Sequence, residues 1–207
     1  MNTDGMATAP LTRADSKALT RTRILEAARR VFERQGFHGS SLDQVAREAG
    51  FTKGAVYSAF DSKADLFLTL LADRATERQQ TWEAMSKRAS TPEAFVVEAM
   101  EHFGASVAEE REWWAAVIEF ATFVARDEAL RLRYAEHHDA TRAALSRTME
   151  DWSERTGKPL AMEPRALATT CLALGNGLTL EWLLAPDEVP RSLYVEANTA
   201  LHRGAQA

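Results

Sequence analysis

Cysteine is almost absent from this 207-residue chain, and so is any long uninterrupted apolar stretch. A single cysteine, Cys171, excludes an internal disulfide and is typical of a protein in a reducing cytoplasm. No apolar run approaches the roughly 20 residues that cross a bilayer, and the first residues lack the charged-then-apolar pattern of a signal peptide. The sequence therefore predicts a cytoplasmic protein with no membrane partner.

Catalytic and metal-binding motifs are also missing from the sequence. We find no His/Glu set at metal spacing, no Gly-rich phosphate loop and no nucleophile with an evident base. His137 and His138 are adjacent, so they point to different faces of a helix, whereas a shared metal requires i, i+4 spacing. Cys171 lies among Ala168 and Leu172, which favours a small core thiol over a nucleophile. We expect no enzyme activity, no cofactor and no metal site.

The charges are distributed unevenly along the chain. The net charge is −5, which by itself argues against a DNA partner. However, residues 1–63 contain ten Lys and Arg against seven Asp and Glu, and the remainder contains 15 against 23. Positive charge is thus concentrated in the N-terminal part. An excess of three charges is modest, so DNA binding would need two copies acting together, which predicts a dimer.

Residues 41–63 show the pattern of two short helices joined by a tight turn. Ser41 is a candidate N-cap of the first helix, Gly50 supplies the left-handed residue that ends it, and Thr52 can cap the second. The positions expected to face inward recur at helical spacing. They are Leu42, Val45, Ala46, Ala49, Val56 and Phe60.

The remaining residues of this segment have side chains suited to DNA. A helix N-terminus attracts phosphate, lysine adds a full charge, glycine permits close backbone approach, and a tyrosine hydroxyl can donate to a phosphate oxygen. Spacing alone leaves two interpretations open: a helix-turn-helix that enters the major groove, or one that only packs two helices. The expected DNA contacts are Ser41, Thr52, Lys53, Gly54, Ala55, Tyr57, Ser58 and Lys63.

Roughly residues 18–78 resemble the N-terminal domain of tetracycline-repressor-type (TetR family) regulators. The resemblance is carried by residues 22–32 (TRILEAARRVF), the pair Gly36-Phe37 and the segment 41–63, which agree with the family in order and spacing. The family commonly has histidine or an aromatic residue where this chain has Ser58-Ala59, a departure that affects operator preference rather than fold.

This resemblance implies a function. It implies a homodimeric transcriptional repressor that binds double-stranded DNA at a pseudo-palindromic operator and is released by a small, largely apolar effector. The alternatives are an all-helical scaffold or an enzyme whose helix-turn-helix is structural only.

The apolar periodicity predicts an all-α fold of about nine helices. We expect a disordered tail over residues 1–16, a DNA-binding domain over 17–63 and a helical regulatory and dimerisation domain over 64–207. The first helix is expected from about Lys17 to Gln35. A helix of some 25 residues follows Ser62, and at 1.5 Å per residue it spans about 37 Å, which suits it to transmit a rigid-body movement between domains.

Aromatic and methionine residues are crowded into three successive helices after the DNA-binding domain. Such a cluster is a candidate effector cavity, although aromatic stripes at helical spacing are more often plain core. Residues 113–124 are apolar nearly all round and so predict a wholly buried helix, in which Glu119 either sits at one exposed edge or faces a polar part of a cavity. The candidate cavity residues are Trp82, Met85, Phe103, Trp113, Trp114, Glu119, Phe120 and Phe123.

The last two predicted helices, 165–184 and 190–202, carry a wide apolar surface. Gly175 and Gly177 are costly in a helix interior but allow another helix to approach closely. In the family that the chain resembles, such helices form a four-helix dimer interface; the alternative is that they complete the core of one subunit. The expected interface residues are Leu174, Leu178, Trp182, Leu193, Ala197 and Leu201.

Overall fold

The computed structural model describes residues 12–205, and within them the chain forms nine α-helices and no β-strand. This confirms the predicted all-α fold. The helices are α1 (Arg13–Gln35), α2 (Leu42–Ala49), α3 (Lys53–Tyr57), α4 (Lys63–Arg88), α5 (Pro92–Glu109), α6 (Arg111–Val124), α7 (Glu128–Thr156), α8 (Pro164–Leu184) and α9 (Ser192–Gly204).

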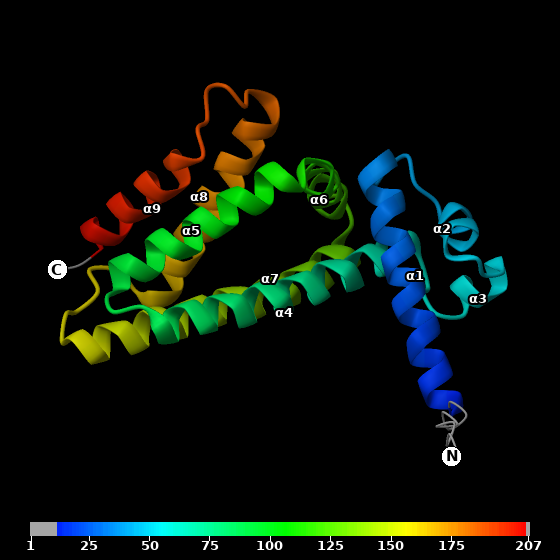
Figure 1. Cartoon of the computed structure of the whole chain (residues 1–207), viewed down its shortest axis with the longest axis horizontal. Helices are drawn as coiled ribbons and strands as arrows, with labels where there is room; N and C mark the ends of the chain where they lie inside the picture. The colour runs from blue at the N-terminus through cyan, green and yellow to red at the C-terminus, as the bar shows by residue number, and fades with distance from the viewer. Residues whose placement is uncertain (1–11, 206–207) are drawn as a thin grey trace, which may run out of the picture.

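The helices form a small unit at one end and a long body (Figure 1). We call α1–α3 the reader unit. In the body, α4 and α7 run side by side, α5 packs along α9, and α8 packs on α7. Helix α1 lies crosswise between α2 and α3 on one side and the start of α4 and α6 on the other.

Helix α1 begins earlier than the sequence predicted. Thr12 accepts a hydrogen bond from the Asp15 backbone N–H, and the Asp15 carboxylate accepts one from the Thr12 N–H. This capping box satisfies two otherwise orphan donors and starts the helix at Arg13 rather than Lys17. The predicted tail of residues 1–16 is therefore wrong for residues 12–16, and residues 1–11 lie outside the described residues.

The helix-turn-helix has the predicted local geometry. The Ser41 hydroxyl accepts from the Gln44 N–H at 3.3 Å, and Gly50 ends α2 in the left-handed conformation, with φ 71° and ψ 28°. Thr52 caps α3 by accepting from the Ala55 N–H at 3.2 Å. The expected inward residues of α2, together with Val56 and Phe60, are all buried.

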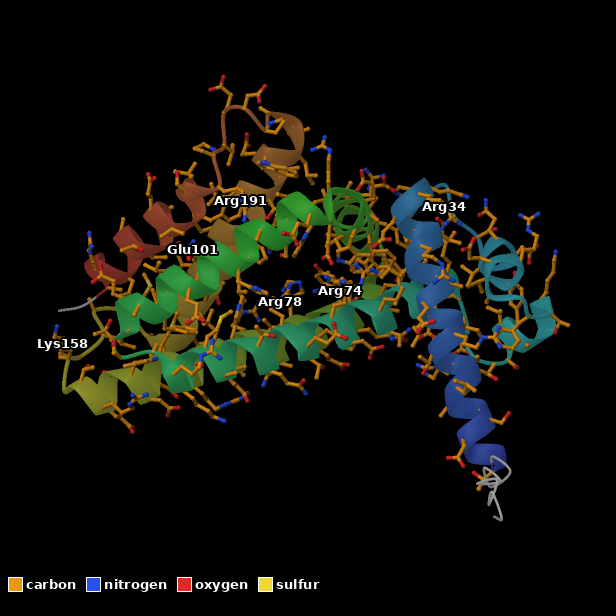
Figure 2. The ribbon with its side chains drawn as sticks, in the orientation of Figure 1. Arg34, Arg74, Arg78, Glu101, Lys158 and Arg191 are labelled. Carbon is orange, nitrogen blue, oxygen red and sulfur yellow. The ribbon has the colours of Figure 1, made fainter. Side chains whose placement is uncertain are left out.

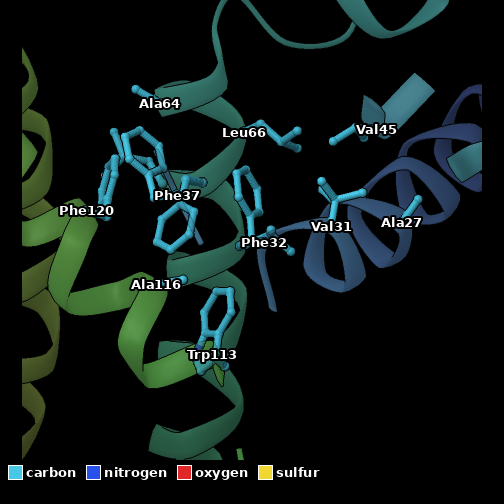
Figure 3. Packing of buried hydrophobic residues seen from close by; sticks show 14 of the residues in the cluster. Ala27, Val31, Phe32, Phe37, Val45, Ala64, Leu66, Trp113, Ala116 and Phe120 are labelled. Atoms are coloured by element: carbon cyan, nitrogen blue, oxygen red, sulfur yellow. The ribbon is translucent and has the colours of Figure 1, made fainter. Parts of the chain in front are cut away.

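A single main hydrophobic core joins the reader unit to the body. Its centre is the fully buried ring of Phe37, which follows α1 and lies 5.4 Å from Phe67 of α4 and 4.9 Å from Phe120 of α6, centroid to centroid. Figure 3 shows Phe37, Phe120 and Phe32 gathered where these helices meet. We call the cluster of Phe32, Phe37, Phe67, Phe120 and Phe123 the Phe37 junction. A second, smaller core at the far end contains Met85, Phe95, Ala99 and Trp152.

Helix α6 is less buried than its sequence predicted. Phe123 is 36% exposed, and Val117 and Ile118 are half-buried. The prediction of a wholly buried helix is wrong because the other helices pack mainly on one side of α6, where Trp113, Ala116 and Phe120 lie.

Gly36 is required by both backbone conformation and space. Its φ of 68° and ψ of 177° belong to a region that only glycine adopts without strain, and a Cβ at this position would lie 2.6 Å from Oε1 of Glu119. That carboxylate accepts a hydrogen bond from the His38 N–H at 3.1 Å, so the turn after α1 fits directly against α6.

We predict that Gly36→Ala lowers the free energy of unfolding by about 2–4 kcal/mol, from backbone strain and loss of the Glu119 contact. Gly50→Ala is the matched control, because its φ is also positive but a Cβ would meet open space; it should cost about 1–2 kcal/mol. Urea unfolding of both variants measures the difference. Equal destabilisation would contradict the role given to Glu119.

Candidate nucleic-acid interface and effector cavity

The outer face of α3 is a continuous exposed surface of small and polar residues. Thr52, Lys53, Gly54, Tyr57 and Ser58 are all exposed. The largest of them is Tyr57, whose side chain is 55% exposed despite its aromatic ring. Ala55 is half-buried, and Ser41, at the start of α2, is exposed. Seven of the eight residues predicted to contact DNA therefore have surface available to a partner.

Lys53 is not a free cation in this structure. Its ammonium pairs with the Asp43 carboxylate on α2, while its side chain remains 66% exposed. An exposed ion pair of this kind contributes only about 0–1 kcal/mol, because water screens it. The lysine can therefore exchange Asp43 for another anion at small cost.

Lys63 differs from the other predicted contacts. Its ammonium donates to the backbone carbonyls of Phe37 at 2.6 Å and Ser40 at 2.9 Å, and it lies over the Phe37 ring. Partial burial lowers the pKa of Lys63, and the nearby Glu119 opposes that shift. The structure thus assigns Lys63 to the loop after α1 rather than to the exposed surface.

Two arginines of α1 support α3 from behind. Arg21 lies over the Phe60 ring, 4.4 Å from its centroid, and donates to the Ala59 carbonyl at 3.2 Å. Arg23 lies over the Phe51 ring at 4.9 Å. Both residues fix the turns on either side of α3, and both guanidinium groups place positive charge beside it.

The body contains a cavity bounded by α4, α5, α6, α7 and α8. Its interior volume is about 100 Å³. Four of the eight predicted cavity residues line it: Trp82, Phe103, Trp113 and Trp114.

The other four predicted cavity residues lie elsewhere. Glu119, Phe120 and Phe123 face the reader unit, because α6 turns that side toward Phe37 and His38. Met85 belongs to the second core, together with Trp152. These corrections follow from the helical phase of α6 and from the length of α4, which carries Met85 beyond the cavity.

The sequence prediction missed the polar part of the cavity. Arg74 and Arg78 of α4 lie in its wall together with Tyr134 and His138 of α7. Figure 2 shows both arginines between α4 and α5. Their signal was visible in the sequence, because two arginines stand one turn apart on the helix face that also carries Leu70, Leu71 and Trp82. The remaining lining residues are Leu71, Ala75, Met100, Val117, His137, Thr141, Cys171, Leu172, Gly175 and Asn176.

Burial shifts the pKa values of His138 and Cys171 in the cavity wall. Burial lowers the pKa of His138, and the positive charges of Arg142 and Arg78 lower it further. A ring nitrogen of His138 lies 2.7 Å from the Tyr134 hydroxyl, a contact that a neutral imidazole can make in either direction. Burial raises the pKa of the Cys171 thiol to about 11, so this thiol is not a ready nucleophile.

No group of three or more His, Cys, Asp or Glu side chains within residues 12–205 is placed to hold a metal ion. The two adjacent histidines do not act as a pair toward one ion. His137 and His138 instead both reach the cavity wall.

Helix α8 presents an apolar face that the chain itself does not cover. By length and composition alone it is the one helix of the described chain long and apolar enough to cross a membrane, and 22% of that window is buried. The predicted interface residues Leu178, Trp182 and Leu193 are half-buried and pack on the main core. Leu174, Ala197 and Leu201 are also half-buried.

The most exposed apolar residues of α8 are others, Leu180 at 38% and Leu184 at 73%. Gly177 lies on the exposed side of the helix, with open space around the position of a Cβ. Gly175 instead faces Phe103 within the subunit. Gly177, Leu180 and Leu184 therefore extend the apolar surface of α8 beyond the residues predicted for the interface.

Comparisons with known sequences match both parts of the chain. Residues 24–70 match the family model described as bacterial regulatory proteins, tetR family, and residues 92–202 match that of the BetI-type transcriptional repressor, C-terminal. The chain is 29% identical to the transcriptional regulator AcrR of Shigella flexneri over 176 residues, which are 81% of this chain and 80% of AcrR. It is 48% identical over 63 residues to the regulator TtgW of Pseudomonas putida, where the match covers 30% of this chain and 46% of TtgW.

Solved structures share the fold. A TetR-family regulator from Rhodococcus sp. superposes with a TM-score of 0.75 at 20% identity, covering 92% of this chain and all of the other. The regulator FadR from Bacillus subtilis, in complex with stearoyl-CoA, gives a TM-score of 0.67 at 16% identity, covering 87% of this chain and 96% of FadR. The chain belongs to the tetR family of bacterial regulatory proteins, and it is a transcriptional regulator.

Proposed function

We propose that this protein is a homodimeric repressor that binds a pseudo-palindromic operator through α3 and leaves it when a small molecule enters the body cavity. The observation that carries the proposal is the division of α3 into two faces. Lys53 and Tyr57, one turn apart, are exposed on the outer face, whereas Val56 is fully buried on the inner face. A helix with its apolar side anchored and its polar side free is what a major-groove reader requires.

We assign the DNA contacts to the exposed set Ser41, Thr52, Lys53, Gly54, Ala55, Tyr57 and Ser58. Lys53 supplies the charge for a phosphate, and Tyr57 supplies a hydroxyl. Lys63 is left out of this set, because its ammonium is held by the carbonyls of the loop after α1. Its role is to support the loop that carries Phe37.

Dimerisation is supported by the exposed apolar face of α8. Leu180, Leu184 and Gly177 give that face both apolar area and room for close helix approach. A second copy that covers this face with its own α8 and α9 would form a self-complementary interface. A soluble protein of the cytoplasm gains by burying such a patch, and we propose this explanation for the apolar α8 rather than a membrane span.

The coupling between cavity and DNA is assigned to α6. The first half of this helix gives Trp113, Trp114 and Val117 to the cavity, and the second half gives Glu119 and Phe120 to the Phe37 junction. A ligand that repacks the first half therefore shifts the second half as well. Release from DNA requires that the ligand bind the DNA-free conformation more tightly than the DNA-bound one. The stearoyl-CoA complex of FadR supports a small-molecule role for a body of this fold.

The direct experiment is a gel shift of labelled DNA from the region upstream of the coding sequence, with unlabelled competitor DNA. We expect one retarded species whose stoichiometry is two chains per site. Absence of a shift at micromolar protein would favour the alternative of a helical scaffold with a structural helix-turn-helix.

Lys53→Ala should weaken binding to all sequences and reduce the salt slope of log K by about 1.8 per dimer, because each subunit loses one phosphate contact worth about 0.9. Asp43→Asn is the matched partner variant, since it removes the carboxylate that competes for Lys53, and it should strengthen binding. Fluorescence anisotropy at several salt concentrations measures both. An unchanged slope in Lys53→Ala would reject its phosphate contact.

Leu184→Glu should convert the dimer to a monomer by placing a charge in an apolar interface. Leu132→Glu is the control, because Leu132 is a leucine with 54% exposure on α7, outside the proposed interface. Sedimentation velocity should give twice the 23.0 kDa chain mass for the unchanged protein and the control, and one chain for Leu184→Glu. A dimer in Leu184→Glu would move the interface elsewhere.

Cys171 should react slowly with iodoacetamide. With a pKa of about 11, only about one thousandth of the thiol is ionised at pH 8, against roughly a quarter for an ordinary thiol. Alkylation of the folded protein should be at least ~100-fold slower than in urea, as followed by mass spectrometry. Equal rates would contradict the burial of the Cys171 thiol and its raised pKa.

A further inference from the structure

The cavity wall contains a guanidinium group that pairs with no carboxylate of residues 12–205. This feature bears on the chemistry of the effector, and the argument rests on the proposed role of the cavity as an effector site. Arg78 projects from the middle of α4, and Figure 2 places it between α4 and α5, away from either end of the body.

The neighbouring arginines each pair with a carboxylate. Arg74, one turn before Arg78 on α4, pairs with Glu110, and Arg29 pairs with the same carboxylate at 2.9 Å. Arg142 of α7 lies 3.3 Å from Asp139. For Arg78, by contrast, no carboxylate of residues 12–205 lies within ion-pair distance. Its central carbon lies over the faces of Trp82 and Trp114, 5.8 Å from each ring centroid.

These two aromatic contacts only weakly compensate the charge of Arg78, which is half-buried in the cavity wall. At 5.8 Å they lie near the outer limit of about 6 Å for a cation–π interaction. Burial lowers the pKa of Arg78, and the charge of Arg74 adds to that effect, whereas Glu110 opposes it from a distance. Because an arginine stays protonated in proteins, the charge is retained at a cost that a bound anion would offset.

The rest of the cavity wall is also short of acceptors. No Asp or Glu is among its lining residues within the described chain. The indole N–H groups of Trp82 and Trp114 are buried and have no hydrogen-bond acceptor in the structure. Two side chains of the wall that could accept, Tyr134 and His138, already bond each other. Buried donors without acceptors destabilise a protein unless something else supplies the acceptor.

We propose that the effector is an organic anion, with one carboxylate or phosphate group that binds Arg78 and an apolar body that lies among Trp82, Phe103, Trp113 and Trp114. A guanidinium fork matches either oxyanion bidentately, and the indole N–H groups supply further donors. A neutral apolar compound would fill the same space but leave the arginine unpaired.

The test compares ligands of equal shape and different charge on the full-length protein. Isothermal titration calorimetry is carried out with benzoate and 2-naphthoate, with their neutral amides benzamide and 2-naphthamide, and with phenyl phosphate. We expect benzoate or phenyl phosphate to bind about tenfold or more tightly than benzamide, and 2-naphthoate to exceed 2-naphthamide by a similar factor. Whichever of benzoate and phenyl phosphate binds more tightly identifies the preferred oxyanion. Equal affinity of anions and amides, or no binding of any probe at millimolar concentration, would overturn the proposal.

Arg78→Met then assigns the preference to one residue, because it keeps an apolar stem and removes the charge. It should bind the amide as before and lose the preference for the anion. Arg74→Met is the matched control: it removes the same charge one turn away, but from an arginine that already has a carboxylate partner, and it should keep most of the preference. If Arg78→Met unfolds, Arg78→Lys replaces it and should weaken anion binding by losing the fork. An anion preference that survives in folded Arg78→Met, or an anion affinity that is unchanged in Arg78→Lys, would overturn the assignment.

This test is separable from that of the proposed function. Gel shifts with and without the best-binding anion report regulation, whereas calorimetry reports the ligand class alone. Selective anion binding without any effect on DNA would reject ligand-responsive release and leave the anion site standing. DNA binding with no charge preference in the cavity would reject the anion and leave the regulator standing.

Discussion

The packing of Phe37 between the reader unit and the body is the interaction on which the rest of the structure depends. Its ring is buried against Phe67 of α4 and Phe120 of α6, while the loop that carries it is held by Glu119 and by the Lys63 ammonium. Burying one phenylalanine of this kind is worth about 1.5–3 kcal/mol. The main core is consequently shared, and neither part completes it alone.

This shared core gives α4 and α6 two neighbours each. The start of α4 belongs to the reader side through Phe67, and its middle carries Arg78 and Trp82 into the cavity. Helix α6 likewise contacts the cavity through Trp113 near its start and the reader unit through Phe120 farther along. A change in cavity packing is therefore transmitted to the reader unit by two rigid helices rather than by a flexible linker. Packed elements of this kind shift between discrete arrangements. The proposed regulation requires nothing more elaborate.

Much of this architecture could be predicted from the sequence because local chemistry determines it. Ser41, Gly50 and Thr52 place the ends of α2 and α3 through caps that act within four residues. Phe120 and Glu119 were assigned to the cavity wrongly, because the phase of α6 against its neighbours is a tertiary property. Arg78 was missed for a related reason: a helix pattern treats arginine as solvated, and only the packing of α5, α7 and α8 around α4 encloses it. The start of α1 after Thr12 was missed because Asp15 stands where a capping box usually has Glu or Gln.

Hydrogen exchange followed by mass spectrometry at increasing urea concentration tests most directly whether the reader unit and the body form one cooperative unit. Peptides from α1 and from α6 should lose protection at the same urea concentration, because both are stabilised by the Phe37 junction. Exchange of α1 through a separate, smaller opening while α6 stays protected would contradict the account, since the two parts would then be joined only by the chain.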